Sequence, residues 1–231
     1  NQVTAVELPT NLMSPIPYFD VVVDNGIHVS SIDDITLYAL NFYPSSTDGF
    51  LVLPTDALGQ QHLAMTYGAD QFTVVATQDN TQVTVTFADD VKIELGTQYN
   101  QGDTLTVTLN QGQSFNALQW NGSNGLAGSS IDANHPVAVF SGARCSFVPE
   151  SIEACDHLVE QLLDVKYWGQ TYYSVPFANR FKGDLFQIVA AFDNTRVSIN
   201  GEYLLTLNKG EWLNDTLETA SVITANHPIQ V

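Results

Sequence analysis

The sequence has few positive charges, and this scarcity excludes several classes of partner. Only 7 residues are Lys or Arg, against 25 Asp and Glu, which gives a formal net charge of −18. Such a surface repels a polyanion and offers few residues to contact its phosphates, so we expect no nucleic-acid partner. Anionic membrane surfaces are disfavoured for the same reason. Divalent cations remain open as ligands, because carboxylate oxygens are plentiful.

Long apolar runs are also missing. No run approaches the roughly 18–20 apolar residues of a membrane span, so we expect no membrane insertion. The chain starts at Asn1 without a charged and then apolar leader, and we expect any secretion signal to have been removed or to lie outside it. Charged residues make up only 14% of the chain, and its abundance of Thr and Asn is common on secreted β proteins. The predicted localisation is extracellular or at the cell surface.

Cysteine is scarce, with Cys145 and Cys155 alone in the sequence. Their separation suits neither a zinc knuckle nor a Cys-x-x-Cys redox pair. In an oxidising compartment they can close a short loop and stabilise the fold by roughly 3 kcal/mol in the chain-entropy model. The alternative is two buried free thiols. We predict the disulfide.

What the sequence does contain is an internal repeat. Three segments recur in the same order: Phe72–Val83 as Phe186–Val197, Leu109–Gly112 as Leu207–Gly210, and Ala133–Val137 as Ala225–Ile229. The members of each pair lie 114, 98 and 92 residues apart, so the first copy has the longer connections. Strands that match and loops that vary indicate a duplicated β unit.

Short alternating runs such as Val83–Phe87 predict strands that bury one face. Asn25-Gly26 and Asn200-Gly201 are hairpin signals. The one credible helix is Asp156–Leu163, in which Asp156 would be the N-cap. We therefore predict an all-β fold of two tandem, related β-sandwich-like units with one short linking helix.

The repeat also predicts how the chain is divided. Residues 1–47 supply N-terminal strands that complete the first unit, 48–142 form the first repeat, 143–157 the disulfide loop, and 158–231 the second repeat. The last strand matches Val137–Ser141 but stops at Val231. We therefore expect the second repeat to continue beyond this sequence.

Several blocks then occur in an order typical of a known family. They are Ser30–Ile35 with Tyr38 and Asn41, Leu53-Pro54, Leu58-Gly59, Pro136–Gly142, Val148-Pro149, Cys155–Leu158 and Trp168-Gly169. From about residue 18 to 231 the chain resembles the N-terminal domain of the IgGFc-binding protein family. The resemblance implies a non-catalytic extracellular module linked to binding or adhesion, found in a mucus-associated animal protein and in bacterial surface proteins. It does not imply antibody binding by this chain, because it supplies no Fc-contacting residues to map. The acidic, Lys-poor composition favours a bacterial member.

Acidic pairs are the first candidate site residues. Asp33 and Asp34 are candidate binding residues, and Asp89 and Asp90 are candidate calcium ligands, since carboxylates in loops suit this ion. No Asp-x-Asp-x-Asp-Gly loop is present, and no cofactor other than calcium is expected. Asp156-His157 near Glu153 can be interpreted as a metal or general-base cluster, or as a helix cap.

Aromatic residues are the second group of candidates. Tyr172 and Tyr173, together with the three Trp residues, would build a platform on which a sugar can stack, or else belong to the core. His135 and His227 precede Pro at matching positions, which favours a turn over a ligand role. No nucleophile elbow, His-Glu-x-x-His motif, phosphate loop or dinucleotide fingerprint occurs. We therefore expect no enzyme, and a hydrolase domain is the least favoured hypothesis.

The favoured hypothesis is a non-catalytic extracellular binding or adhesion module of a larger surface protein. Its partner would be a protein ligand, a glycan ligand or copies of itself. The alternative is a structural subunit or spacer of an extracellular filament or surface layer. Such a subunit would assemble by strand addition, with residues 1–14 as the donor strand.

Overall fold

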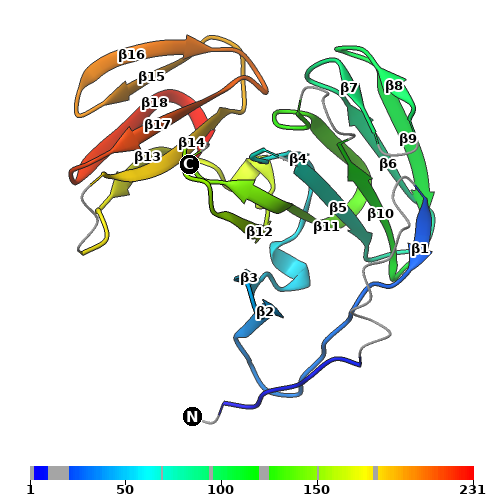
Figure 1. Ribbon diagram of the computed structural model, residues 1–231. Helices are drawn as coiled ribbons and strands as arrows, with labels where there is room; N and C mark the ends of the chain where they lie inside the picture. Colours follow the sequence, from blue (N-terminus) through cyan, green and yellow to red (C-terminus); the bar gives the residue numbers. More distant parts are fainter. Residues whose placement is uncertain are drawn as a thin grey trace.

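The computed structural model describes residues 3–9, 21–68, 70–93, 96–119, 125–149, 151–178 and 182–231. Almost all regular structure in these residues is β-strand, arranged as two large curled sheets that stand side by side (Figure 1). The predicted all-β fold of two related units is confirmed. Among the described residues, the only helical elements are two 3-10 turns, η1 (Thr55–Ala57) and η2 (Val165–Tyr167).

The first sheet has the strand order β1-β10-β5-β11-β6-β9, and both β4 and β12 also pair with β11. Its strands are β1 (Val22–Asp24), β4 (Gly59–Leu63), β5 (Asp70–Ala76), β6 (Thr81–Thr86), β9 (Thr104–Leu109), β10 (Gln113–Leu118), β11 (Ser130–Phe147) and β12 (Cys155–Gln161). Alternation explains why these segments form strands: Val83 and Val85 are fully buried while their Thr and Gln neighbours face outward. The buried side chains, Phe72, Phe115 and Ile131 among them, form one apolar core.

The second sheet has the matching strands in the same order when it is read from the opposite edge, and β17, which matches β10, has no described neighbour corresponding to β1. Its order is β16-β15-β18-β14-β17, with β13 paired to β18. Its strands are β13 (Gly169–Ser174), β14 (Asp184–Ala190), β15 (Thr195–Ile199), β16 (Glu202–Leu207), β17 (Trp212–Leu217) and β18 (Ser221–Gln230). A separate apolar core, which includes Ile188, Val197 and Ile223, lies within this sheet.

The Asp-Asn-Thr turns match in geometry as well as in sequence. Asn80 and Asn194 both have φ of 57°, in the left-handed region that Asn tolerates. The Asp side chain before each of them accepts a hydrogen bond from a backbone N–H of a second turn, that of Gln111 or of Lys209, at 3.0 Å in both copies. The repeat therefore preserves a cross-turn hydrogen bond that fixes where two hairpins meet.

The unequal spacing of the repeat has a structural cause. In the first copy the connection from β6 to β9 contains a two-stranded insertion, β7 (Val91–Lys92) and β8 (Gln98–Tyr99). In the second copy the Asn200-Gly201 turn makes the same connection, with positive φ at both residues, which confirms that hairpin signal. Asn25-Gly26 does not form a hairpin: it follows β1, where Gly26 N–H donates to the Gly112 carbonyl. This second hairpin prediction is wrong.

The predicted linking helix is also wrong. Residues 155–161 form β12, which pairs antiparallel with the second half of β11. An eight-residue helix is marginal in water, whereas β11 offers an open edge that satisfies the backbone groups of β12. The helical part of the connection is the three-residue η2, where Asp164 accepts the Lys166 N–H.

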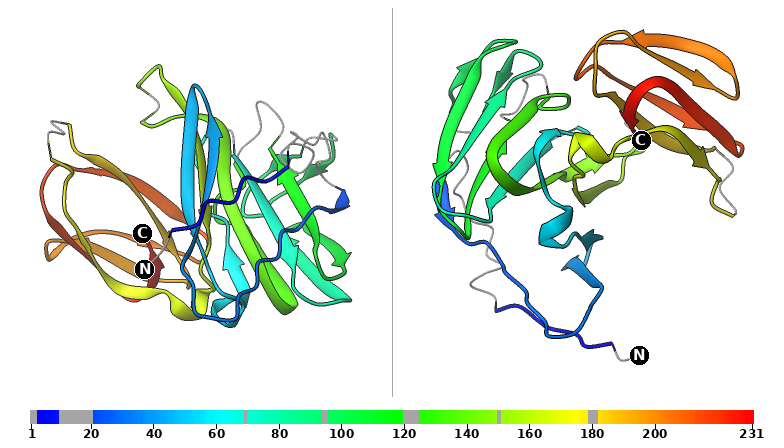
Figure 2. Two further views of the ribbon diagram at one scale, coloured as in Figure 1. Left: turned by 90° about the horizontal axis from the view of Figure 1, so that it is seen from below. Right: turned by 180° about the vertical axis from the view of Figure 1, so that it is seen from behind.

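A hairpin of β2 (Leu37–Tyr43) and β3 (Ser46–Val52) lies alongside β12 (Figure 2). The sequence of residues 1–47 predicts strands that add to the first unit, with Phe19–Val23 and Ile35–Phe42 as the candidate segments. Within them β1 pairs with β10, and part of the Phe19–Val23 strand falls outside the described residues. The Ile35–Phe42 strand corresponds closely to β2.

The two sheets are joined by a small apolar junction. Leu63 of the first unit packs with Trp168, Val189 and Ala191. The Gln187 side-chain amide donates to the Thr66 carbonyl at 2.9 Å. Trp168 is thereby a core residue, which is the second of the two roles that its sequence left open.

Candidate functional site

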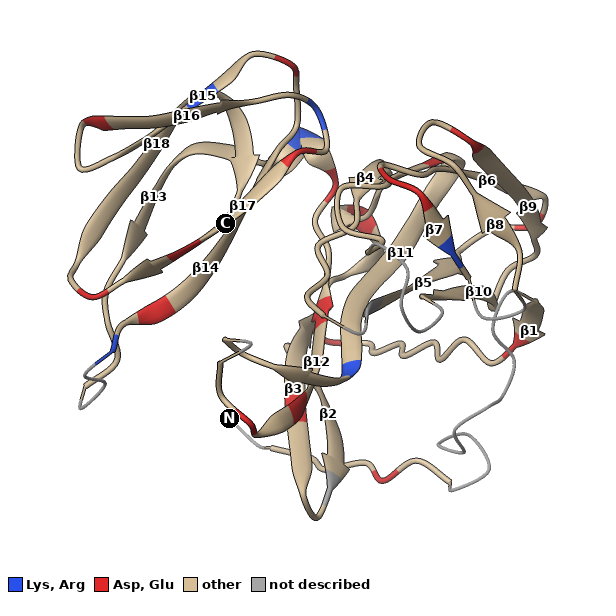
Figure 3. Ribbon diagram, turned by 45° about the horizontal axis from the view of Figure 1, so that its top comes forward, with Lys and Arg blue, Asp and Glu red and all other residues tan. Residues whose placement is uncertain are grey.

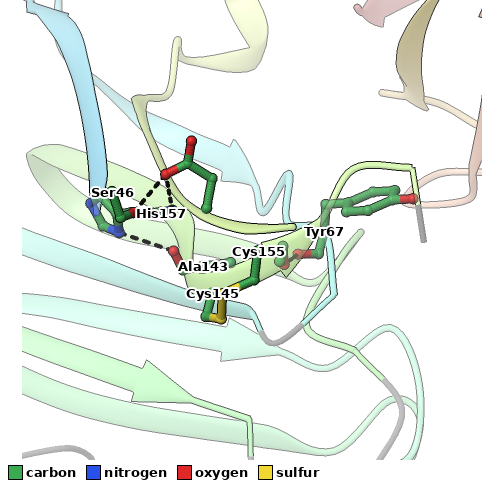
Figure 4. Close-up of a disulfide and its surroundings, with 8 residues drawn as sticks. Ser46, Tyr67, Ala143, Cys145, Cys155 and His157 are labelled. Atoms are coloured by element: carbon green, nitrogen blue, oxygen red, sulfur yellow. Dashed lines mark hydrogen bonds between the residues drawn. A yellow bond between two sulfur atoms is a disulfide. The ribbon is translucent and has the colours of Figure 1, made fainter. Parts of the chain in front are cut away.

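Side chains of the β2–β3 hairpin hold it against β12. The backbone N–H of Val159 donates to the Asp48 carboxylate at 2.9 Å, and that of His157 donates to the Ser46 hydroxyl at 2.7 Å. Ser46 in turn donates to the Asp156 carboxylate at 2.6 Å (Figure 4). β3 and β12 are thus joined by side-chain to backbone hydrogen bonds, and the hairpin remains a separate two-stranded sheet.

His157 completes this anchor. Its Nδ1 lies 3.0 Å from the Ala143 carbonyl oxygen, which can only accept, so Nδ1 carries the proton. Its Nε2 then accepts from the Asn41 side-chain amide, also at 3.0 Å. The Ser46 hydroxyl and then the His157 N–H hold the pKa of Asp156 below its usual value. The Asp156-His157 pair therefore orients the hairpin, and its helix-cap interpretation is wrong because no helix follows.

The predicted disulfide between Cys145 and Cys155 is confirmed. It joins the end of β11 to the start of β12 across 10 residues, next to the hairpin anchor (Figure 4). Both cysteines are exposed. The bridge fixes the two strands that carry His157 and its partner carbonyl.

The outward side of the anchored hairpin is apolar. Alternate residues of β2 point away from the body, and Tyr38, Leu40 and Phe42 remain 73%, 70% and 71% exposed. Leu51, opposite Tyr38, is 42% exposed. These four side chains form the outer hairpin face. β2 has no charged residue, and Asp48, the one charge of β3, is bound to Val159 (Figure 3). Contiguous exposed apolar side chains of this kind mark interaction surfaces.

A second concave feature, the inter-repeat cleft, lies between the two sheets and has a volume of about 750 Å³. The first unit lines it with residues around the β7–β8 insertion, including Asp89 and Gln101. The second unit contributes the β16–β17 turn and Trp212, which is 44% exposed. Small-molecule ligands favour clefts of this size with a few polar groups.

The chain was compared with known proteins. The family model described as IgGFc binding protein matches residues 48–231. The chain belongs to the IgGFc-binding protein family. The human IgGFc-binding protein is 37% identical over 164 residues, which cover 68% of this chain and 3% of the human protein. No solved structure matches. The bacterial source that the composition favoured is not supported by this human relative.

The predicted binding acids Asp33 and Asp34 are not among the residues that line the inter-repeat cleft. Asp33 and Asp34 are exposed in the segment between β1 and β2. Their binding role stays a prediction.

Tyr172 and Tyr173 are neighbours in β13 and therefore point to opposite sides of the strand. Tyr172 donates from its hydroxyl to the Ile229 carbonyl at 2.7 Å, so its polar end is used inside the fold. Tyr173 is 78% exposed. Trp168 is buried and Trp120 lies outside the described residues. The structure does not bring these aromatics together, although each Tyr keeps its predicted binding role as a hypothesis.

The candidate calcium ligands take part in turns. Asp89 accepts the Asp90 N–H at 2.7 Å, and Asp90 accepts the Gln101 N–H at 2.9 Å. No group of three or more His, Cys, Asp or Glu is placed to hold a metal ion within the described ranges. The described residues therefore give no support to the calcium expectation. Nor does any helix in the described part of the chain have the length and apolar character to cross a membrane.

The predicted Asn-His-Pro turns are wrong, because both segments lie inside long strands, β11 and β18. In β11 the pairing with β4 shifts register across this segment, between Asp132 and Val137. The side chain of Asn134 accepts the Gln82 N–H at 2.8 Å, and that of Asn226 accepts the Arg196 N–H at 2.5 Å. Asn134 and Asn226 therefore make the same hydrogen bond in the two repeats, which accounts for their recurrence in the sequence. His227 packs near Phe192.

Sequence reasoning missed the outer hairpin face and a buried histidine. His62 is 2% exposed, and neither of its ring nitrogens has a hydrogen-bond partner among the described residues. Burial lowers its pKa to about 4, against the opposing attraction of Asp164 and Asp132. The period-two alternation of β2 was visible in the sequence, but alternation does not tell which face is covered.

Proposed function

We propose that the chain is a non-catalytic extracellular binding module of a larger protein and that its partner is a protein. Family membership supports a binding role, because the family and its human member are named for binding IgG Fc. The chain spans about 3% of the human protein, which supports its description as one module among others. The exposed disulfide supports an oxidising, extracellular location.

The outer hairpin face is the observation that carries this proposal. Tyr38, Leu40 and Phe42 lie on adjacent outward positions of one strand. The anchor of Ser46, Asp48 and His157 fixes that strand before a partner arrives, so little conformational entropy is lost on docking. Aromatic anchors with aliphatic neighbours are typical of the residues that dominate protein interfaces. The Fc region of immunoglobulin G is the partner we propose for this face.

Binding to immobilised Fc fragment, measured by biolayer interferometry, tests the proposal. We expect the double variant Leu40→Ser/Phe42→Ser to bind at least tenfold more weakly than the parent, because it removes apolar contact area. The control is Phe177→Ser, which removes an equally exposed aromatic from the connection between β13 and β14. Equal affinity of parent and double variant would exclude the face, and no binding by the parent would exclude Fc as the partner.

The alternative of a filament or surface-layer subunit has one structural observation in its favour. β2 pairs only with β3 among the described strands, so its other edge is open to strand addition. Residues 1–2 and 10–14 of the proposed donor segment lie outside the described residues. Light scattering separates the two functions: a binding module stays monomeric at micromolar concentration, whereas a subunit assembles and a peptide copying residues 1–14 blocks assembly.

A further inference from the structure

The two repeats differ at one position that faces the inter-repeat cleft. Ser114 in β10 pairs with Val75, and Trp212 in β17 pairs with Val189 at the matching register. In the first repeat β1 covers this edge, and the Ser114 hydroxyl bonds to Asn25. In the second repeat no described strand covers the outer edge of β17. The small Ser114 is thus paired with a neighbouring strand, whereas the large Trp212 at the matching position lines an open cleft.

Packing does not explain Trp212. It is 44% exposed and belongs to none of the apolar clusters of the described residues. Its indole N–H has no hydrogen-bond partner among them. Half-exposed Trp in a concave site offers an apolar ring face and a free donor to a ligand that presents both C–H and O–H groups.

The rest of the cleft indicates the class of this ligand. Its neutral hydrogen-bonding side chains come from both repeats and are those of Thr86, Gln101, Ser130, Thr206 and Asn208. Lys209 also lines the cleft, where it is outnumbered by two acids. Asp89 and Glu211 add carboxylate acceptors, and the backbone N–H of Asn208 holds Glu211 in place at 2.7 Å. One aromatic ring among many polar groups suits a sugar better than an apolar peptide side chain. The two acids and the net charge of −18 oppose an anionic ligand.

We propose that the inter-repeat cleft binds a neutral oligosaccharide, with Trp212 as the surface on which one sugar ring stacks. Gln101 and Asp89, which flank the β7–β8 insertion, bind hydroxyl groups from the side of the first repeat. Glu211 and Thr206 bind hydroxyl groups from the side of the second. This insertion is present only in the first repeat, so the duplication itself does not create a second such site. The cleft is distinct from the outer hairpin face, and the two ligands bind independently.

A glycan array followed by Trp fluorescence titration tests this inference. The probes are tri-N-acetylchitotriose, N-acetyllactosamine and maltotriose as neutral sugars, with sialyllactose as the anionic one. We expect at least one neutral probe to bind and sialyllactose to bind at least tenfold more weakly than that probe. Trp212→Ser introduces the residue of the first repeat and should weaken binding at least tenfold. Gln101→Ala should weaken it severalfold.

The controls separate the two surfaces. Phe177→Ser and the hairpin variant Leu40→Ser/Phe42→Ser should leave sugar affinity unchanged, and circular dichroism verifies that each variant folds. The titration with Trp212→Ser is followed by calorimetry, because the variant removes the reporting fluorophore. Failure of every neutral probe at millimolar concentration, a preference for sialyllactose, or unchanged affinity in Trp212→Ser would overturn the proposal. Fc binding by the hairpin would be untouched by any of these results.

Discussion

Gly128 and Gly210 meet backbone to backbone where the two repeats join. A Cβ atom on either residue would collide with the carbonyl oxygen of the other. Both have a positive φ, 81° at Gly128 and 79° at Gly210. Glycine is therefore required at both positions for two reasons, the positive φ and the close approach of the two backbones.

Replacing Gly128 by Ala should loosen the junction. We expect a loss of roughly 1–2 kcal/mol from the left-handed conformation and a further ~1–3 kcal/mol from overpacking against Gly210. Gly112→Ala is the matched control, because Gly112 also has φ of 81° but has nothing within 4 Å of an added Cβ. Urea unfolding gives both values. Equal losses in the two variants would show that the contact contributes nothing.

His62 should make stability depend on pH. Its pKa is lowered to about 4 in the folded chain and returns to roughly 6.5 on unfolding. The unfolded state thus binds the proton more readily, so stability is full above pH 6.5 and falls as the pH drops to 4, by about 3 kcal/mol. Urea unfolding at a series of pH values measures this loss. Backbone N–H groups, which outweigh burial, hold the pKa of Asp164 below its usual value, so its contribution is lost only at lower pH.

The variant His62→Leu should flatten the profile between pH 6.5 and 4. It removes the group that takes up the proton and two ring nitrogens that lack partners. His28→Gln serves as the control, because His28 is exposed and should leave the slope intact. A slope that persists in His62→Leu would assign the pH dependence to other groups.

Removing the disulfide should destabilise the first unit. Cys145→Ser/Cys155→Ser opens a loop of 10 residues, and we expect a loss of about 3 kcal/mol from the added freedom of the unfolded chain. Thermal unfolding with and without reductant measures it. Reductant should shift the parent to the value of the double variant and leave the variant unchanged. A shift in the variant as well would point to an effect unrelated to the bridge.

Ser46→Ala should free the hairpin without unfolding the protein. It removes one acceptor of the His157 N–H, which keeps Asp156 as a second acceptor, and it removes the donor to Asp156. We therefore expect local loosening of the hairpin and little change in global stability. Hydrogen exchange should then accelerate at amides of β2 and β3 and not in β5 or β6. Ser45→Ala, in the adjoining exposed turn, is the control. Uniform acceleration over the first sheet would show that the hairpin is not a separate unit.

The repeat carried most of what the sequence revealed about the fold. Its Asp-Asn-Thr segments form turns through local side-chain chemistry, which a sequence reveals, whereas its Asn-His-Pro segments lie inside strands. The return of the same segments in β14 to β18 indicated two related units, while the order of the strands within each sheet came from the structure alone. The boundaries of the four predicted parts remain a prediction.

The candidate surfaces were harder to predict because they depend on what is missing around a residue. Residues 156–161 have a weak helical pattern, and the edge of β11 made them a strand. In the sequence Leu40 and Phe42 look like ordinary core-facing strand residues, and only the structure shows that their side of the hairpin is exposed. Trp212 and Ser114 occupy matching positions, but β1 covers the strand edge beside Ser114 and no described strand covers the edge beside Trp212. No local sequence pattern records this difference. Sequence therefore predicts elements better than it predicts their exposure.

The matched turns at Asn80 and Asn194 also bear on how this chain reaches its native state. Each turn is closed by the same hydrogen bonds, so during collapse a strand of one copy is an acceptable neighbour for the strands of the other. A nascent chain therefore has two competing ways to complete each hairpin, the condition for swapping between adjacent homologous units. Among the described residues the β7–β8 insertion and β1 occur only in the first copy, so they distinguish its strands from those of the second copy. Divergence between the copies thus protects the chain against misassembly with itself.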